Sequence, residues 1–230
     1  MEAVNSKKYR VKRIFDTISY RYDFLNHFLS LGVDYYWRSK AIQLSNMNEN
    51  TILLDVACGT GDFAIAAAKS GVHKIFGADF SFNMLNLFDK KAGWIRGKTA
   101  QSVAEHLPFK DGSFTNITVA FGVRNFYDIP EGFKSFHRIL RQDGKATILE
   151  FRLPSNLLIR KFYLLYFNKI LPMLGRIISK DKEAYTYLPE SVDEFDKKVN
   201  LVQILKQSGF REVNKYSLSL GLVQVVIAEK

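Results

Sequence analysis

The chain has 230 residues, of which 47% are hydrophobic and 24% are charged; it carries a single cysteine and a formal net charge of +10. This length fits one large domain, or at most two, and is enough to bury a full hydrophobic core without disulfides or structural metal ions. The lone cysteine excludes an internal disulfide and the first 13 residues lack an apolar signal segment, so we expect a protein of the reducing cytosol. The positive charge suggests an anionic partner without choosing between nucleic acid and a lipid surface.

Apolar runs alternate with helix-like segments from residue 51 onward, which predicts repeated strand–helix–strand units. Strands are expected at 51–58, 73–80, 114–122 and 145–151, with a weaker one at 99–104. Helices are expected at 62–71, at 82–91 with Ser81 as cap, at 130–144 and at 191–210. Such units build an α/β fold whose parallel sheet is covered on both faces.

The last twenty residues follow a different pattern. Two β runs, 211–220 and 221–230, meet at Gly221 and are too close together for a helical crossover. They should therefore pair antiparallel. A mostly parallel sheet that ends in an antiparallel hairpin is typical of Rossmann-like methyltransferases, whereas dinucleotide dehydrogenases generally continue in parallel.

A glycine loop follows the first predicted strand, in the run TILLDVACGTGD at 51–62. Gly59 and Gly61 allow a tight turn and a close approach of the backbone to a ligand. Asp79 lies twenty positions after Gly59, at the end of the next apolar run, where a carboxylate can accept both hydroxyls of an adenosine ribose. The spacing indicates a nucleotide cofactor, and it also satisfies the dinucleotide fingerprint.

The charge of this loop helps to choose between a dinucleotide and S-adenosylmethionine as the cofactor. A dinucleotide places its pyrophosphate on a helix N-terminus that is free of negative charge. This loop brings Asp55 and Asp62 to that place. Two carboxylates suit a ligand that carries an ammonium and a sulfonium, so we favour S-adenosylmethionine, although either aspartate can also be read as a strand end or a helix cap.

Aromatic and basic residues alternate in the stretch 155–182, and a second basic cluster lies between residues 7 and 13. No uncharged apolar run there approaches the ~18 residues of a membrane span. The stretch suits an interfacial helix or a wall for an apolar substrate, and equally an ordinary helix that closes the core. The four histidines are dispersed without ligand spacing, so no metal site is predicted.

Several segments resemble the ubiquinone/menaquinone biosynthesis C-methyltransferase family over nearly the whole chain. The most specific are FGVRNF at 121–126 and YTYLPES at 185–191, and the N-terminal run FDTISYRYDFLNHFLSLGVDYYWR at 15–38 matches as well. The resemblance implies a class I, Rossmann-like methyltransferase with a mostly parallel seven-stranded sheet. It also implies methyl transfer from S-adenosylmethionine to a ring carbon of a prenylated hydroquinone, foremost demethylmenaquinol, with a benzoquinol of the ubiquinone pathway as the alternative.

Carried over by position, the family pattern assigns cofactor contacts to residues around the glycine loop and at the following strand ends. These are Asp55, Gly59, Thr60, Gly61, Asp79, Val103, Ala104 and Ala120. Two of them depart from the pattern, because Val103 replaces a polar residue beside the adenine and Ala120 replaces a common serine.

The same resemblance places Arg124 and Asn125 beside the quinol ring. Ring carbon is nucleophilic enough only when a quinol hydroxyl is ionised, so a cation or a base near that hydroxyl would accelerate methyl transfer. We expect Arg124 to stabilise the quinolate and Asn125 to position it. The base is either Tyr22 or a water held by Arg124, with Asp128 and His106 as further candidates on chemistry alone.

The whole chain, 1–230, is expected to form a single methyltransferase domain. Its N-terminal helical cap, about 1–45, and an aromatic helical insertion, about 155–190, would form a lid over the substrate. We expect a cytoplasmic enzyme with transient contact to the inner membrane surface and no nucleic-acid partner, and a homodimer stays open. RNA methylation and NAD-dependent oxidation are the rival functions; the first lacks its usual N/D-P-P-Y/F motif, since AFGVRNF occupies that place.

Overall fold

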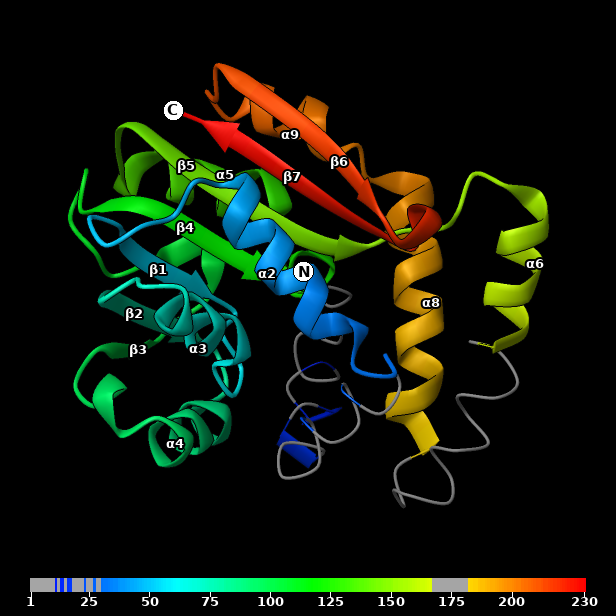
Figure 1. Ribbon diagram of the computed structural model, residues 1–230, viewed down its shortest axis with the longest axis horizontal. Coiled ribbons are helices and arrows are strands. Elements are labelled where there is room, and N and C mark those ends of the chain that lie inside the picture. Colours follow the sequence, from blue (N-terminus) through cyan, green and yellow to red (C-terminus); the bar gives the residue numbers. More distant parts are fainter. Residues whose placement is uncertain are drawn as a thin grey trace.

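The computed structural model describes residues 30–166 and 182–230, together with residues 11, 13–14, 16–17, 23 and 27; side chains at 182–186 are outside this description. Seven strands form one sheet in the order β3-β2-β1-β4-β5-β7-β6, shown in Figure 1. Their bounds are β1 Ile52–Val56, β2 Lys74–Asp79, β3 Thr99–Gln101, β4 Phe114–Ala120, β5 Leu140–Phe151, β6 Glu212–Leu218 and β7 Val223–Glu229.

The first five strands are parallel, and the last two form an antiparallel hairpin. Strand β7 lies between β5 and β6 and is antiparallel to both. This confirms the sequence prediction of a mostly parallel sheet with a terminal hairpin. In this arrangement β1, β2 and β4 end at a common edge of the sheet.

Helices cover both faces of the sheet, because alternate residues of each strand point to opposite sides. On one face Leu53 packs with α2 (Val33–Leu44), α3 (Asp62–Lys69) and α4 (Phe82–Lys91). On the other face Leu54 packs with α5 (Ile129–Ile139), α8 (Lys182–Lys198) and α9 (Leu201–Gln207). The remaining elements are α6 (Leu157–Leu165) and the short turns η1 (Gly93–Ile95), η2 (Ala104–His106), η3 (Val123–Asn125) and η5 (Ser219–Gly221).

Helix capping follows the sequence pattern at two helices. The Ser81 hydroxyl accepts a hydrogen bond from the backbone N–H of Met84 and so caps α4, as predicted. The Asp128 carboxylate accepts from the backbone N–H of Glu131 and caps α5, whose second position holds Pro130. Both caps lie at the edge of the sheet where β2 and β4 end.

Two predicted helix boundaries are wrong. The helix expected to reach Gly144 ends at Ile139, because Leu140 pairs with Phe114 and the residues up to Gly144 extend β5. The helix expected over 191–210 is two helices, which are divided where Asn200 accepts a hydrogen bond from the backbone N–H of Gln203 and starts α9. Sheet pairing and a local cap overrode the helical pattern in these places.

Helix α6 lies beyond α8 in the view of Figure 1. Its apolar side chains are largely exposed to solvent. Leu157 is 80% exposed, and Leu158, Phe162 and Leu165 are also exposed. Only Tyr163 of this helix is buried. Among the residues that the structure describes, no helix combines the length and the apolar character of a bilayer span.

Candidate active site

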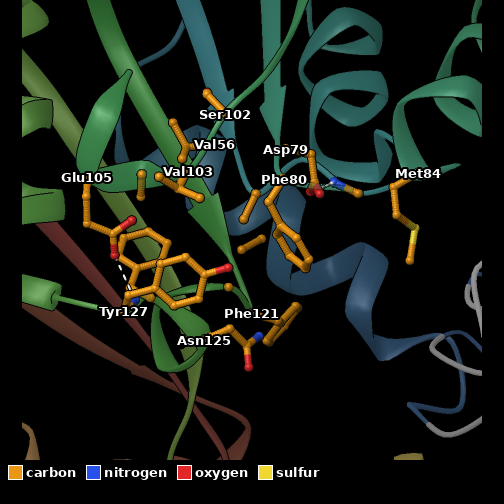
Figure 2. A pocket seen from close by; sticks show the side chains of 16 residues that line it. Val56, Asp79, Phe80, Met84, Ser102, Val103, Glu105, Phe121, Asn125 and Tyr127 are labelled. Carbon is orange, nitrogen blue, oxygen red and sulfur yellow. Dashed lines mark hydrogen bonds between the residues drawn. The ribbon is translucent and has the colours of Figure 1, made fainter. Parts of the chain in front are cut away.

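A cavity that opens to solvent lies at the carboxyl edge of the sheet. Val56, Asp79 and Ala120, the last residues of β1, β2 and β4, all line it. Figure 2 shows the labelled lining side chains around this space, with Asp79 and Glu105 on opposite sides of it. The position suits a small-molecule ligand, because open α/β sheets bind ligands at the edge where their parallel strands end.

The glycine loop brings the backbone to the cavity wall. Gly59 has a positive φ of 53° and lines the cavity, while Gly61 has a φ of 85° and serves as N-cap of α3. A Cβ atom at Gly61 would lie 2.1 Å from the ring of Phe88, so only glycine fits between the loop and α4. The loop is therefore shaped by local packing as well as by access for a ligand.

Asp79 is held by two backbone donors. Its carboxylate accepts hydrogen bonds from the N–H of Gly59 and the N–H of Ser81, each at 2.8 Å. Burial raises the pKa of Asp79 to about 6, although these two bonds favour its ionised form. An ionised carboxylate accepts up to about four hydrogen bonds, so Asp79 keeps capacity for two ligand hydroxyls.

Asp55 lies at the same end of the sheet but is absent from the cavity lining. It is 1% exposed, and its Oδ1 accepts a hydrogen bond from the Thr118 hydroxyl across the β1–β4 pair at 2.7 Å. Among the described residues, its Oδ2 has no hydrogen-bond partner. Burial raises the pKa of Asp55 to about 7, so this group is only partly charged at neutral pH.

Asp62 also lies outside the cavity lining and takes part in an ion-pair network. Its carboxylate pairs with Lys91 and lies 3.4 Å from Nη2 of Arg38. His27 and Asp34 complete this cluster, in which Arg38 also pairs with Asp34. The ligand atoms of His27, Asp34 and Asp62 lie close enough together to hold a metal ion. Arg38 and Lys91, however, already neutralise the two carboxylates. The negative charge that faces the cavity comes from Asp79 and Glu105, not from Asp62.

The other predicted cofactor residues divide into two groups. Val103, Ala104 and Ala120 line the cavity, as the family pattern implies. Thr60 is buried beneath the loop, and its hydroxyl donates to the carboxylate of Asp23 in the N-terminal stretch. Gly61 shapes the loop without lining the cavity.

Arg124 and Asn125 both belong to η3 but point to different places. Asn125 lines the cavity. Arg124 is 8% exposed, is absent from the cavity lining, and donates from Nη1 to Oε1 of Glu150 at 2.7 Å. The Phe121 carbonyl also accepts from Nη1. Arg124 is thus a buried ion-pair partner directly behind the cavity.

Sequence reasoning missed two carboxylates of this site. Glu150 at the end of β5 is fully buried and accepts from the Phe151 N–H at 3.0 Å as well as from Arg124. Glu105 lines the cavity and accepts from the backbone N–H groups of Tyr127 and Asp128, at 2.7 and 2.9 Å. A glutamate within the otherwise apolar strand run KATILEF was the available signal for Glu150.

The four candidates for the base are placed as follows. Tyr22 lies outside the described residues. His106 and Asp128 are exposed and do not line the cavity, and Asp128 is occupied as the cap of α5. Neither therefore faces the space where a substrate would lie, which leaves Tyr22 and a water as the proposed bases.

The residues present fit S-adenosylmethionine. Asp79 offers acceptors for ribose hydroxyls, Gly59 lets the ligand approach the backbone, and Phe80, Met84, Val103 and Ala104 give an apolar wall for the adenine. The unpartnered Oδ2 of the buried Asp55 supplies further negative potential close to the loop. A pyrophosphate would meet two carboxylates on the cavity wall, which disfavours a dinucleotide.

Comparison with known proteins gives a consistent result. A model of the ubiE/COQ5 methyltransferase family matches residues 1–230. The ubiquinone/menaquinone biosynthesis C-methyltransferase UbiE of Geotalea uraniireducens is 41% identical over 236 residues, with 100% of both chains covered. The demethylmenaquinone methyltransferase of Chlorobaculum parvum is 40% identical over 96% of this chain and 92% of its own. The demethylmenaquinone methyltransferase of Bacteroides fragilis is 36% identical over 97% of this chain and 94% of its own.

Solved structures share the fold at low sequence identity. A SAM-dependent methyltransferase from Thermotoga maritima superposes with a TM-score of 0.63 at 18% identity, covering 95% of this chain and 99% of its own. A SAM-dependent methyltransferase from Aquifex aeolicus gives a TM-score of 0.58 at 15% identity, covering 84% and 88%. At such identities the likeness shows the fold alone.

Proposed function

Because the chain belongs to the ubiE/COQ5 methyltransferase family, we propose that it methylates a ring carbon of a prenylated hydroquinone, with S-adenosyl-L-methionine as donor. The foremost substrate is demethylmenaquinol, the reduced quinone implied by the names of relatives at 36 and 40% identity over nearly their whole length. A benzoquinol of the ubiquinone pathway is the alternative, which the name of the Geotalea relative supports.

One observation carries this proposal: Asp79 and Asn125 line the same cavity. Asp79 belongs to the part of the site that suits a ribose, whereas Asn125 is a neutral amide in η3, the turn that follows β4, where an acceptor ring would lie. A donor and an acceptor held in one cavity can react without further diffusion. The catalytic task of the chain is therefore mainly to place and polarise the acceptor.

When bound, S-adenosyl-L-methionine supplies a sulfonium methyl, whose bond to sulfur breaks, leaving its electron pair on sulfur, as the ring carbon takes the methyl. Asp79, Gly59, Val103 and Ala104 would hold the donor. A base must take the proton of the quinol hydroxyl, and Tyr22 or a water is proposed for this role. The proton on the methylated ring carbon then leaves to solvent, which restores aromaticity. With the substrate bound, the apolar cavity wall would limit the access of water, a rival nucleophile for the methyl group.

Arg124 is proposed to stabilise the ionised quinol from behind the cavity, with Asn125 in contact with it. Its partner Glu150 offsets part of this positive charge, so the effect at the ring oxygen is weaker than that of an unpaired guanidinium. Arg124→Ala should lower turnover if this role is correct. Wild-type turnover in a folded variant would remove Arg124 from the mechanism.

The N-terminal stretch and the 155–190 insertion are proposed as a lid over the substrate. Asp23 accepts from Thr60, and Asp16 accepts from the Ser81 hydroxyl at 2.6 Å, so the N-terminal stretch contacts the cofactor loop. Val11 and Ile14 are buried against Tyr187 and the cavity residue Phe80. An apolar lid of this kind would enclose part of a prenyl tail, since its burial contributes about 25 cal/mol per Å².

Peripheral contact with the inner face of the membrane is part of the proposal. The solvent-facing leucines and phenylalanine of α6 lie on the same short helix as Arg160 and Lys161. An apolar face beside basic residues suits an anionic lipid surface. This would let a cytoplasmic enzyme reach a membrane-resident quinol.

The decisive experiment measures methyl transfer to chemically reduced demethylnaphthoquinol by mass spectrometry. A product heavier by one methyl group, formed only with S-adenosyl-L-methionine, supports the proposal. Demethylated benzoquinol and transfer RNA serve as parallel acceptors. In a separate experiment, calorimetry measures the binding of NADH and of S-adenosylhomocysteine to the protein. Methylation of RNA alone, or tight binding of NADH instead of S-adenosylhomocysteine, would contradict it.

A further inference from the structure

A tyrosine hydroxyl from α8 is bonded to the amide of the cavity residue Asn125. Tyr187 is 8% exposed, and its hydroxyl donates to Oδ1 of Asn125 at 2.6 Å. The two residues are 62 positions apart, and α8 packs against η3, which carries Asn125. Tyr187 belongs to the YTYLPES run, to which the proposed methyl transfer assigns no role.

This bond decides which side of the amide faces the cavity. An asparagine side chain has one carbonyl oxygen, which accepts, and one NH₂ group, which donates. With the oxygen engaged by Tyr187, the nitrogen is the group left for a ligand. In Figure 2 the amide nitrogen of Asn125 points toward Phe121, while the oxygen points away from the other labelled side chains.

A donor is the useful group at this position. Negative charge develops on the quinol oxygen beside the attacking carbon, and an N–H group directed at that oxygen stabilises it. An amide turned the other way would direct a carbonyl oxygen at the same charge and oppose the reaction. The neighbouring cation cannot correct this, because Arg124 is partly neutralised by Glu150 and does not line the cavity.

We propose that Tyr187 is a positioning residue that fixes Asn125 as a hydrogen-bond donor to the ionised ring oxygen of the acceptor. The inference rests on the proposed function, since it takes the acceptor to be a quinol. It assigns to Asn125 the direct contact with the developing charge. Tyr187 acts through Asn125 and needs no contact of its own with the substrate.

Three substitutions test the proposal: Tyr187→Phe, Asn125→Ala and Asn125→Asp. Each is assayed for kcat and KM with reduced demethylnaphthoquinol and for binding of S-adenosylhomocysteine by calorimetry. Tyr187→Phe should lower kcat about tenfold, the effect of one positioning hydrogen bond, with cofactor affinity unchanged. The kcat of Asn125→Asp should be lower than that of Asn125→Ala, because a carboxylate would then face the negatively charged quinolate in place of an amide donor.

The double variant separates positioning from structural support. If Tyr187 acts through Asn125, adding Tyr187→Phe to Asn125→Ala causes no further loss of kcat. If Tyr187 had a purely structural role, Tyr187→Phe would instead lower the melting temperature of the protein. It would also lower kcat by the same factor in the wild type and in Asn125→Ala. Tyr216→Phe, on the exposed strand β6, is the matched control for loss of one phenolic hydroxyl and should keep wild-type kcat.

The outcomes distinguish this inference from the proposed function. If the wild-type enzyme methylates no quinol, the proposed function fails and the acceptor is not a quinol. If it methylates the quinol and Tyr187→Phe keeps wild-type kcat, the positioning role is wrong. Greater activity in Asn125→Asp than in Asn125→Ala would show that the amide works as an acceptor and would overturn the assignment.

Discussion

Buried charges dominate the site at the scale of single residues. Glu150 and Arg124 are both nearly inaccessible to water, and the bond between them is 2.7 Å long. Such a pair need not stabilise the fold relative to an apolar pair of the same shape. Losing one member is costly, however, because the other is left as an uncompensated charge in the protein interior.

We predict that Glu150→Ala lowers the free energy of unfolding by about 3 to 5 kcal/mol, because it leaves the Arg124 charge buried without its carboxylate. Urea denaturation measures this loss. Glu150→Gln should cost less, since the amide oxygen still accepts from Arg124. Equal stability of the alanine variant and the wild type would show that water reaches this pair.

The pH dependence of stability follows from Asp55, whose pKa rises from 3.8 to about 7 on folding. An acid with a raised pKa binds its proton more tightly in the folded state, so the unfolded chain binds fewer protons between these pH values. Stability should therefore be highest near pH 4 with respect to this group and should fall as pH rises toward 7. The raised pKa of Asp79, about 6, acts in the same direction.

Asp55→Asn should remove the contribution of this carboxylate. Three pKa units correspond to a difference on the order of 4 kcal/mol, so the variant should be more stable than the wild type at pH 8 by up to this amount and similar at pH 4. Urea denaturation at the two pH values measures it. If the free energy of unfolding of Asp55→Asn falls with rising pH as much as that of the wild type, groups other than Asp55 cause the effect.

At the scale of elements, α6 is distinguished by the apolar side chains that it leaves exposed. Its only buried residue is Tyr163, and Leu157, Leu158 and Phe162 are more than half exposed. A helix packed in this way contributes little to the core. Packing against the described core therefore does not account for its apolar composition.

We predict that replacing Leu158 and Phe162 by serine weakens binding to vesicles of phosphatidylglycerol and phosphatidylcholine, because apolar area no longer enters the interface. Sedimentation with vesicles at low and high salt measures this, and binding of the wild type should fall with salt. Leu220→Ser, which removes a leucine with 77% exposure from the terminal hairpin, is the control. Equal binding by all three proteins would exclude α6 as the contact.

Local patterns predicted the terminal hairpin and the glycine loop, because both depend on neighbours in sequence. Gly59 and Asp79 were found by spacing, and the terminal hairpin by the short connection at Gly221. The orientation of Asp62 and the roles of Glu150 and Tyr187 were not predictable in this way. Their partners come from other elements, as Arg38 and Lys91 do for Asp62, so only the folded arrangement reveals them. The end of α5 was missed for the same reason, since Leu140 is drawn into the sheet by β4.

For the whole molecule, ligand binding and stability are linked. A ligand that binds only the folded state stabilises it by about 2.7 kcal/mol at a hundred times its Kd. We predict that S-adenosylhomocysteine at that excess raises the melting temperature by several degrees. Asp79→Asn should reduce this shift strongly, because the ribose loses its charged acceptor while the loop keeps its backbone.

Differential scanning fluorimetry with increasing ligand measures this linkage. NADH at the same concentrations is the control and should leave the melting temperature unchanged. A full shift in Asp79→Asn would place the ribose elsewhere in the cavity.

The position of β7 has a consequence for folding. This strand follows β6 in the chain but lies between β5 and β6 in the sheet. During folding, β5 keeps an open edge until residues 223–229 pair with it, and β6 has no strand to join before β7 is in place. Unpaired strand edges invite association with other chains. Folding copies of this protein should therefore depend on chaperones most strongly before β7 joins the sheet.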